Sequence, residues 1–236
     1  MKVKRHCIYV RMVHWLVAIS TFILFFSGFG QMPVYERYFV TSIPGLGWTG
    51  DYSITLLLHY IFAIVLIFAA VFHLVYHGIR KDFAILPRRG DVGESVKIIK
   101  AMLGFGKEPP SDKYLAEQRL AYVFVGGSFL LVIVTGVIKI LKNFPSFHFG
   151  KDFLLWNTNL HNLAAFLLLF GIVAHLGAFV FKENRKLLPG IFTGLICADY
   201  TKHRHKLWYD KLKDCDFVEK TTSKDKEKKP EVCLDC

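Results

Sequence analysis

Cysteine is scarce in this sequence and absent from its long apolar stretches. The five cysteines are Cys7, Cys197, Cys215, Cys233 and Cys236. All of them fall in segments that the charge pattern assigns to the cytoplasm, where thiols stay reduced, so we expect no framework of structural disulfides. Cys233-x-x-Cys236 is not followed by a histidine. It is therefore not the Cys-x-x-Cys-His motif that attaches haem covalently.

Three interpretations of the C-terminal cysteines stay open. Together with Cys215 or Cys197, Cys233 and Cys236 have a spacing that suits a tetrahedral zinc or iron–sulfur site. The pair could instead be redox-active. In the third interpretation, these residues are ordinary thiols with no ligand.

Acidic residues are also few, with 19 Asp and Glu against 30 Lys and Arg, for a net charge of +11. We assign this excess to membrane topology and expect no nucleic-acid partner, because a basic protein that binds nucleic acid is more often soluble, with a patterned basic face. No small-residue cleavage pattern ends the first apolar run, so we expect no cleaved signal peptide. The sequence also has no repeat of 20 to 50 residues.

Hydrophobic residues, in contrast, make up 53% of the chain, with 22 Phe. They are concentrated in four blocks, at about residues 10–30, 52–78, 120–141 and 153–181. Each block has the roughly 20 residues that a helix needs to cross the hydrocarbon core. Because a lipid-embedded backbone must satisfy its own polar groups, these blocks are helices. The sequence therefore predicts an all-α, integral membrane four-helix bundle.

The distribution of Lys and Arg predicts the orientation of this bundle. One such residue lies between the first two blocks, against 9 in residues 78–119 and 13 from Lys182 onward. The positive-inside rule then places both termini and the long middle loop in the cytoplasm. We expect a transmembrane domain at 1–188 and a basic cytoplasmic tail at 189–236.

Histidines are the unexpected residues inside the apolar blocks, which contain His14, His59, His73, His161 and His175. An ionisable residue in a span usually faces the bundle interior and indicates function. His161 and His175 are fourteen residues apart, which is close to four full helical turns. They lie on one helix face, about 21 Å apart along its axis. This spacing suits two haems stacked across a bilayer, since bundle cores commonly hold such cofactors.

Depth in the membrane then suggests the partner of each histidine. His59 lies near the start of the second block and matches the outer His161. The inner His175 has two candidate partners, His14 in the first block and His73, which follows His59 by fourteen residues. Geometry alone does not choose between them. Two imidazoles fill both axial positions of an iron, so such a haem transfers electrons and binds no substrate.

Several segments resemble a known family. They are RMVHW and SG in the first block, LLHYIFA in the second, KYLAEQR and VTGVI around the third, LHNLAAFLLLFGIVAH in the fourth, and HRHKLWYDKL in the tail. Over about residues 5 to 213 the sequence resembles the gamma (cytochrome b) subunit of membrane-bound respiratory formate dehydrogenases. That family belongs to a wider group of dihaem cytochromes b that includes the hydrogenase cytochrome b subunit.

The resemblance implies two haem b groups, the outer one held by His59 and His161 and the inner one by His14 and His175. It thereby favours His14 over His73 as the inner ligand. His73 is then a spare polar group near the inner haem.

The resemblance also implies a quinone site beside the inner haem, involving Tyr114, Gln118 and His175. The family motif Lys-Tyr-Asn-Ala-Gly-Gln is here KYLAEQ, residues 113–118. Leu115 replaces the Asn and cannot bind a quinone through its side chain. Glu117 replaces the Gly, and is either a source of protons or a solvated loop charge.

As a whole, the sequence predicts an electron-transfer subunit in the inner (cytoplasmic) membrane. An extracytoplasmic iron–sulfur subunit would supply electrons, a catalytic subunit would hold the substrate-dehydrogenating site that this chain lacks, and quinone would be the diffusible acceptor. One alternative keeps the redox role in a hydrogenase, a sulfur-compound reductase or a cytoplasmic redox complex. Another is a non-redox membrane anchor with structural histidines.

Overall fold

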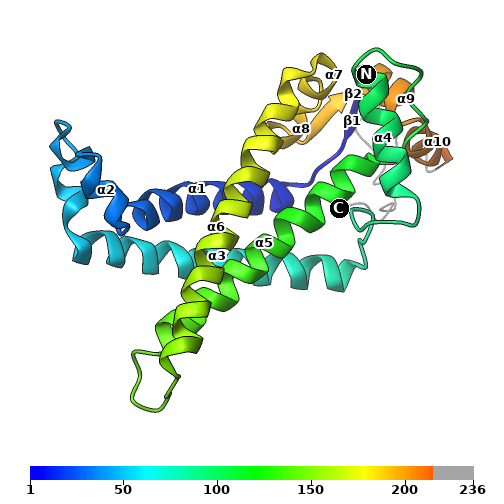
Figure 1. Cartoon of the computed structure of the whole chain (residues 1–236). Helices are drawn as coiled ribbons and strands as arrows, with labels where there is room; N and C mark the ends of the chain where they lie inside the picture. The colour runs from blue at the N-terminus through cyan, green and yellow to red at the C-terminus, as the bar shows by residue number, and fades with distance from the viewer. Residues whose placement is uncertain (215–236) are drawn as a thin grey trace, which may run out of the picture. The chain divides into compact units, whose positions relative to one another are not determined.

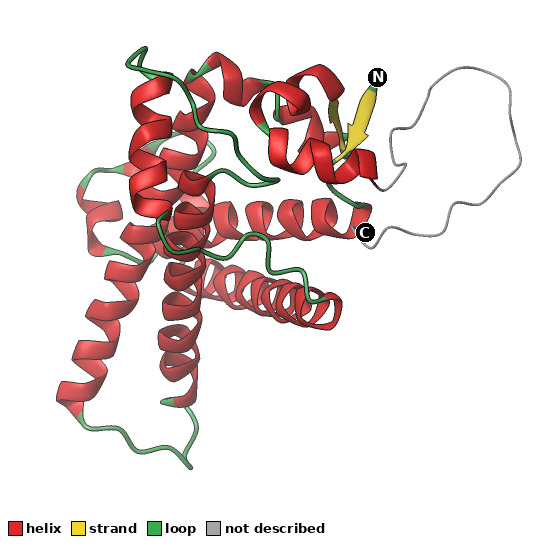
Figure 2. Ribbon diagram, turned by 90° about the vertical axis from the view of Figure 1, so that its right-hand side faces the viewer, coloured by secondary structure: helices red, strands yellow, loops and turns green. Residues whose placement is uncertain are grey.

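The computed structural model describes residues 1–214 of the 236-residue chain. Within that range, four helices are long and apolar enough to cross a membrane. They are α1 (Ile8–Gly30), α3 (Tyr52–Arg80), α5 (Ala116–Leu141) and α6 (Lys151–Gly177). The predicted class, a mostly helical four-helix membrane protein, is confirmed (Figure 2).

Short elements connect and follow these spans (Figure 1). The helical ones are α2 (Pro33–Arg37), η1 (Val40–Ser42), η2 (Gly47–Gly50), α4 (Asp91–Met102), η3 (Ala178–Val180), α7 (Lys182–Arg185), α8 (Leu188–Phe192), α9 (Ala198–Arg204) and α10 (Lys206–Asp214). The strands are β1 (Lys2–Lys4) and β2 (Leu195–Cys197). Pro189 lies at the start of α8, where its missing N–H costs no helical hydrogen bond.

The chain divides into two compact units. One is Tyr9–Lys81, which contains α2, α3 and nearly all of α1. The other joins Met1–Ile8 to the chain from Asp82 onward.

In the second unit, α5 and α6 run side by side (Figure 1). They are antiparallel, because only the short segment 142–150 connects them. Gly171 allows the close approach, since a Cβ there would lie 2.9 Å from Cγ2 of Val125. Large apolar side chains such as Phe170 and Val173 are exposed on the outer surface, as expected for a face that contacts lipid.

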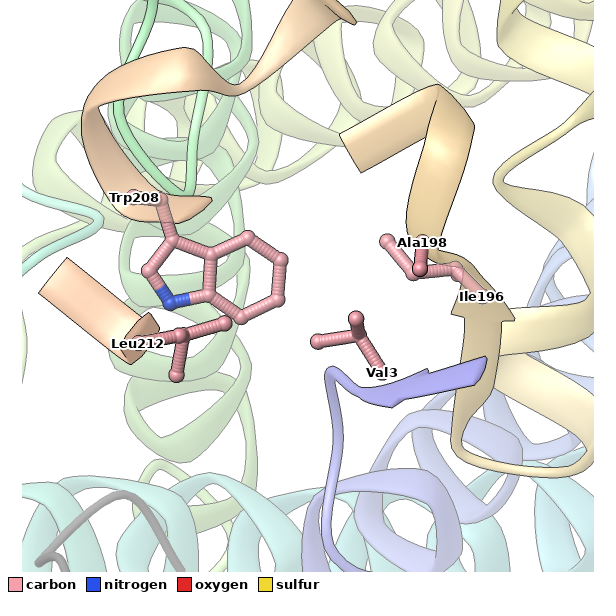
Figure 3. Packing of buried hydrophobic residues seen from close by; sticks show 5 residues of the cluster. All are labelled: Val3, Ile196, Ala198, Trp208 and Leu212. Carbon is pink, nitrogen blue, oxygen red and sulfur yellow. The ribbon is translucent and has the colours of Figure 1, made fainter. Parts of the chain in front are cut away.

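The ends of the described chain meet in a small polar-rimmed domain outside the spans, which we call the cap (Met1–Cys7, 107–115 and 187–213). Strands β1 and β2 pair antiparallel, with Val3 opposite Ile196. Figure 3 shows the cluster beneath them, in which Val3, Ile196 and Ala198 pack with Trp208 and Leu212. The first part of the predicted tail is thus folded against the N-terminus.

Helix α4 is fastened to the start of α5 by a buried ion pair. The Arg119 guanidinium donates to both carboxylate oxygens of Asp91, at 2.8 Å from Nε and 2.6 Å from Nη2. Both side chains are almost fully buried. Beneath them Ile98, Leu115 and Ala116 form a small apolar core.

Candidate functional site

His59 lies in α3 and is held from α1. Its Nδ1 is 3.0 Å from Oγ of Ser27 in a hydrogen bond. The next residue, Gly28, faces the same imidazole, and a Cβ there would lie 3.5 Å from Cε1 of His59. The ring therefore has a hydroxyl at Nδ1 and a residue without a side chain at Cε1.

His161 lies in α6 and is held from α5 in the same way. Its Nδ1 is 2.9 Å from Oγ1 of Thr135. A Cβ on Gly136, the next residue, would lie 3.3 Å from Cε1 of His161. Asn157 supports this arrangement, because its Nδ2 donates to the carbonyl of Thr135 at 3.0 Å.

The fourteen-residue histidine pairs both fall within unbroken helices. His59 and His73 are in α3, and His161 and His175 are in α6. The members of each pair therefore share a helix face and are about 21 Å apart along the axis. Since each of these helices crosses the membrane, one histidine lies toward each surface.

The inner candidates have aromatic and imidazole neighbours. The His14 ring meets Trp15 edge-on, with centroids 5.5 Å apart. The His175 ring meets Phe179 at 5.9 Å. The His73 ring lies 4.5 Å from the ring of His77, one turn further along α3.

Two of the predicted quinone residues, Tyr114 and Gln118, lie where the cap meets α5, and the third, His175, lies in the last turn of α6. Backbone N–H of Leu115 donates to Oε1 of Gln118 at 3.2 Å, which caps the helix and fixes the Gln118 side chain there. Leu115 itself is fully buried and packs in the apolar core against α4. The position at which the resembling family has Asn is thus a core position in this protein.

Two cationic side chains, those of Arg5 and Lys113, lie over the ring of Tyr114. The Arg5 guanidinium carbon is 5.5 Å from the ring centroid, and Nζ of Lys113 is 5.8 Å away. The neighbouring Glu117 has one carboxylate oxygen, Oε2, that is buried and has no hydrogen-bond partner among residues 1–214. Such an oxygen is costly to leave charged, and it marks Glu117 as chemically distinct from a solvated loop residue.

Arg5 is a buried cation in the cap. Its guanidinium lies over the rings of Tyr114 and Trp208, and Nη1 donates to Nε2 of His205 at 3.4 Å. Burial lowers the pKa of Arg5. Burial, followed by the charge of Arg5, lowers the pKa of His205 to about 3. His205 is therefore neutral and donates from Nδ1 to the Asp112 carbonyl at 2.7 Å.

Residues 1–214 contain no group of three or more His, Cys, Asp or Glu side chains that could hold a metal ion. Cys7 is buried and Cys197 is exposed, and neither forms a disulfide within this range. The predicted metal or redox thiols, Cys233 and Cys236, lie outside the described residues.

Sequence reasoning did not assign a role to Ser27, Thr135 or Gly136. The signal was nonetheless present, because Ser27-Gly28 and Thr135-Gly136 are the SG and TG dipeptides within the segments that carry the family resemblance. Each hydroxyl contacts an imidazole on another helix, so neither dipeptide identifies its partner by itself.

These features define a class of protein. Apolar spanning helices whose histidines are held through Nδ1 by hydroxyls of neighbouring helices are suited to bind haem through Nε2, as in a membrane cytochrome. Residues 5–194 match the model of the family described as prokaryotic cytochrome b561. The chain belongs to this family, which implies haem b and a role as a membrane electron-transfer subunit.

A curated relative agrees with this assignment. The chain is 24% identical over 215 residues to a protein of Haemophilus influenzae named formate dehydrogenase, cytochrome b556 subunit. The match covers 88% of this chain and 82% of the relative.

Proposed function

We propose that this chain is a dihaem cytochrome b subunit of a respiratory formate dehydrogenase, which carries electrons across the membrane to a quinone. The observation that carries the proposal is the pair His161 and His175 on one unbroken apolar helix. Family membership and the name of the relative support the redox role and the formate dehydrogenase partner.

In this proposal His59 and His161 hold the outer haem, and His14 and His175 hold the inner haem. Bound by two imidazoles, haem b accepts and releases one electron at a time and offers no open iron position to a substrate. Ser27 and Thr135 orient the outer imidazoles.

Reduced-minus-oxidised spectra and haem extraction from the purified complex test this assignment. We expect two haem b per chain. His161→Ala should remove one haem and leave the other. The exposed loop residue His148 provides the matched control, since His148→Ala should keep both. A parent protein with no b-type haem would refute the proposal and would favour the membrane anchor. A parent protein with a single haem would refute the two-haem assignment.

The proposed quinone site is next to the first turn of α5 and the last turn of α6. Gln118 is near the start of α5 and His175 near the end of the antiparallel α6. Because Oε1 of Gln118 accepts the backbone bond of Leu115, its amide Nε2 is the group that can donate to a quinone carbonyl. Tyr114 borders the same helix start, whereas the buried Leu115 contributes packing.

Glu117 is the proposed proton donor of this quinone site. Its buried, unpartnered Oε2 is where a proton would be held. Glu117→Gln should slow quinol formation several-fold while both haem spectra stay unchanged. Glu183→Gln, at an exposed position, is the control. Equal rates in the two variants would assign Glu117 to the surrounding packing alone.

The proposal also fixes orientation and partners. Both termini and the segment between α3 and α5 are cytoplasmic, since they carry most of the Lys and Arg. An iron–sulfur subunit then docks at the opposite surface and the catalytic subunit beyond it.

Fusions to alkaline phosphatase, which is active only outside the cytoplasm, test this orientation. The enzyme fused after Lys213 should be inactive, and the enzyme fused within 142–150 should be active. Co-purifying subunits separate formate dehydrogenase from a hydrogenase or sulfur-compound reductase.

A further inference from the structure

The two outer histidines are held by the same arrangement, which occurs once in each unit. In both cases a helix presents a hydroxyl residue followed by glycine, and a second helix presents the imidazole. The distances agree within a few tenths of an ångström, at 3.0 and 2.9 Å from hydroxyl oxygen to Nδ1, and 3.5 and 3.3 Å from the glycine Cβ position to Cε1.

The spacing along the chain agrees as well. Ser20, Ser27 and Gly28 in α1 correspond to Ser128, Thr135 and Gly136 in α5, each 108 residues later. All four hydroxyl residues are buried. One hydroxyl–imidazole contact could be incidental. Two independent copies at one sequence offset indicate that the arrangement has a role.

The position of each hydroxyl hydrogen follows from its acceptors. Oγ of Ser27 lies 2.8 Å from the carbonyl of Ile23, and Oγ1 of Thr135 lies 2.7 Å from that of Leu131. A carbonyl oxygen can only accept, so each hydroxyl donates its single hydrogen to its own helix. Toward the imidazole the hydroxyl oxygen can then only accept. We therefore assign the proton to Nδ1 of His59 and of His161, the tautomer in which each ring donates to the hydroxyl oxygen.

This hydrogen-bond arrangement determines which ring nitrogen can bind a metal. A neutral imidazole with a proton on Nδ1 has its free lone pair on Nε2. A partner that accepts from the other ring nitrogen fixes both tautomer and ring orientation, and it raises the basicity of the ligand. The glycines that follow keep the Cε1 edge of each ring clear of a side chain.

We propose that Ser27 and Thr135 are positioning residues that hold His59 and His161 as Nδ1–H tautomers, so that both present Nε2 to one and the same haem iron and lower its reduction potential. The inference rests on the proposed role of these histidines as the outer ligands. It adds that two hydroxyls that are not themselves ligands control the potential of the outer haem, and that the inner haem is outside their influence.

Ser27→Ala and Thr135→Val each remove the hydroxyl acceptor with little change of volume. A less basic imidazole stabilises ferric iron less, so the outer potential should become more positive. We expect a change of up to about tenfold in the ferrous-to-ferric ratio, which is about 59 mV for a one-electron couple. Haem affinity should fall by roughly 10- to 100-fold. Ser27→Thr and Thr135→Ser retain the hydroxyl and should restore values near those of the parent.

Two other hydroxyls on the same helices provide matched controls. Oγ1 of Thr21 donates to the Val17 carbonyl at 2.6 Å, and Oγ of Ser128 to the Phe124 carbonyl at 2.8 Å. Neither has an imidazole partner among the described residues. Thr21→Val and Ser128→Ala therefore lose only the bond within the helix, and they should leave the outer potential unchanged.

The experiment is a redox titration of the purified complex, followed by optical and low-temperature electron paramagnetic resonance spectra of the low-spin ferric haems. Ser27→Ala and Thr135→Val should shift the same one of two potentials in the same direction. If the parent holds two haems and His161→Ala removes one, but both variants titrate like their controls, the inference is wrong while the proposed function stands. If Ser27→Ala fails to assemble, Thr135→Val decides, because it acts on the other ligand of the same haem.

Discussion

Arg5 donates a hydrogen bond to Nε2 of His205, a residue 200 positions away in the sequence. The bond joins the N-terminal segment to the junction between α9 and α10. His205 is fully buried and its opposite nitrogen donates to the Asp112 carbonyl. A neutral imidazole thus fills the gap between a guanidinium donor and a carbonyl acceptor, and the stability of the cap depends on its staying neutral.

We predict that the cap loosens on mild acidification. The pKa of His205 is about 3 in the folded protein and about 6.5 in an unfolded chain. Between these values the unfolded state binds more protons, so stability is fully present above pH 6.5 and declines as pH falls below it. Protonation would also place an N–H donor on Nε2 of His205, where it faces the N–H donor of Arg5.

Hydrogen exchange of the intact chain, corrected for intrinsic rates, measures this effect. Amides of β1 and α9 should exchange faster at pH 5 than at pH 7. His205→Asn should abolish the pH dependence, and His203→Asn, at the exposed neighbouring position, should keep it. Equal protection of the parent at the two pH values would contradict the prediction.

Asp91→Asn should release α4 from the start of α5. Breaking a buried ion pair costs about 3–5 kcal/mol, because the remaining charge stays buried without its partner. Arg119 would be that charge, since it is 4% exposed and its other carboxylate neighbour, Glu94, is at the longer distance of 3.7 Å. Amide exchange in α4 should accelerate by roughly 2–4 orders of magnitude.

An exposed ion pair provides the control for this substitution. Glu183 and Lys186 are both about half exposed, and such pairs contribute about 0–1 kcal/mol. Glu183→Gln should leave α4 unchanged. Comparable exchange rates in the two variants would show that the Asp91–Arg119 pair does not hold α4.

Gly136→Ala should disturb the outer site more than Gly28→Ala does. The added methyl would lie 3.3 Å from the His161 ring, which is too close without a small movement, but 3.5 Å from the His59 ring, which is ordinary contact. We expect reduced haem retention and a shifted spectrum for Gly136→Ala only. Gly78→Ala, where a Cβ meets nothing within 4 Å, is the control for helix substitution.

His14→Ala should remove the inner haem, and His73→Ala should keep it. The His73 imidazole is 4.5 Å from the His77 ring, which suits a spare polar pair on α3. Haem stoichiometry with redox titration distinguishes the two variants. Loss of the inner haem in His73→Ala with retention in His14→Ala would reverse the assignment and give a plan with two ligands on each of α3 and α6.

Helix boundaries show where sequence reasoning was limited. The third span was predicted from residue 120 but begins at Ala116, because Gln118 caps the backbone of Leu115. The fourth was predicted to residue 181 but is α-helical only to Gly177, with a 3-10 turn to Val180. The β1–β2 pairing was not predicted at all, since neither three-residue strand has a pattern of its own.

The number and type of the spans and the common face of His161 and His175 could be predicted from the sequence. These properties depend on local composition and on the helical repeat, which act within one segment. Only the tertiary structure decided that Ser27 meets His59, that Thr135 meets His161, that Leu115 is core and that His205 is enclosed beside Arg5. Those contacts join residues far apart in the chain, and they depend on which helices pair and how each is rotated, which local periodicity does not specify.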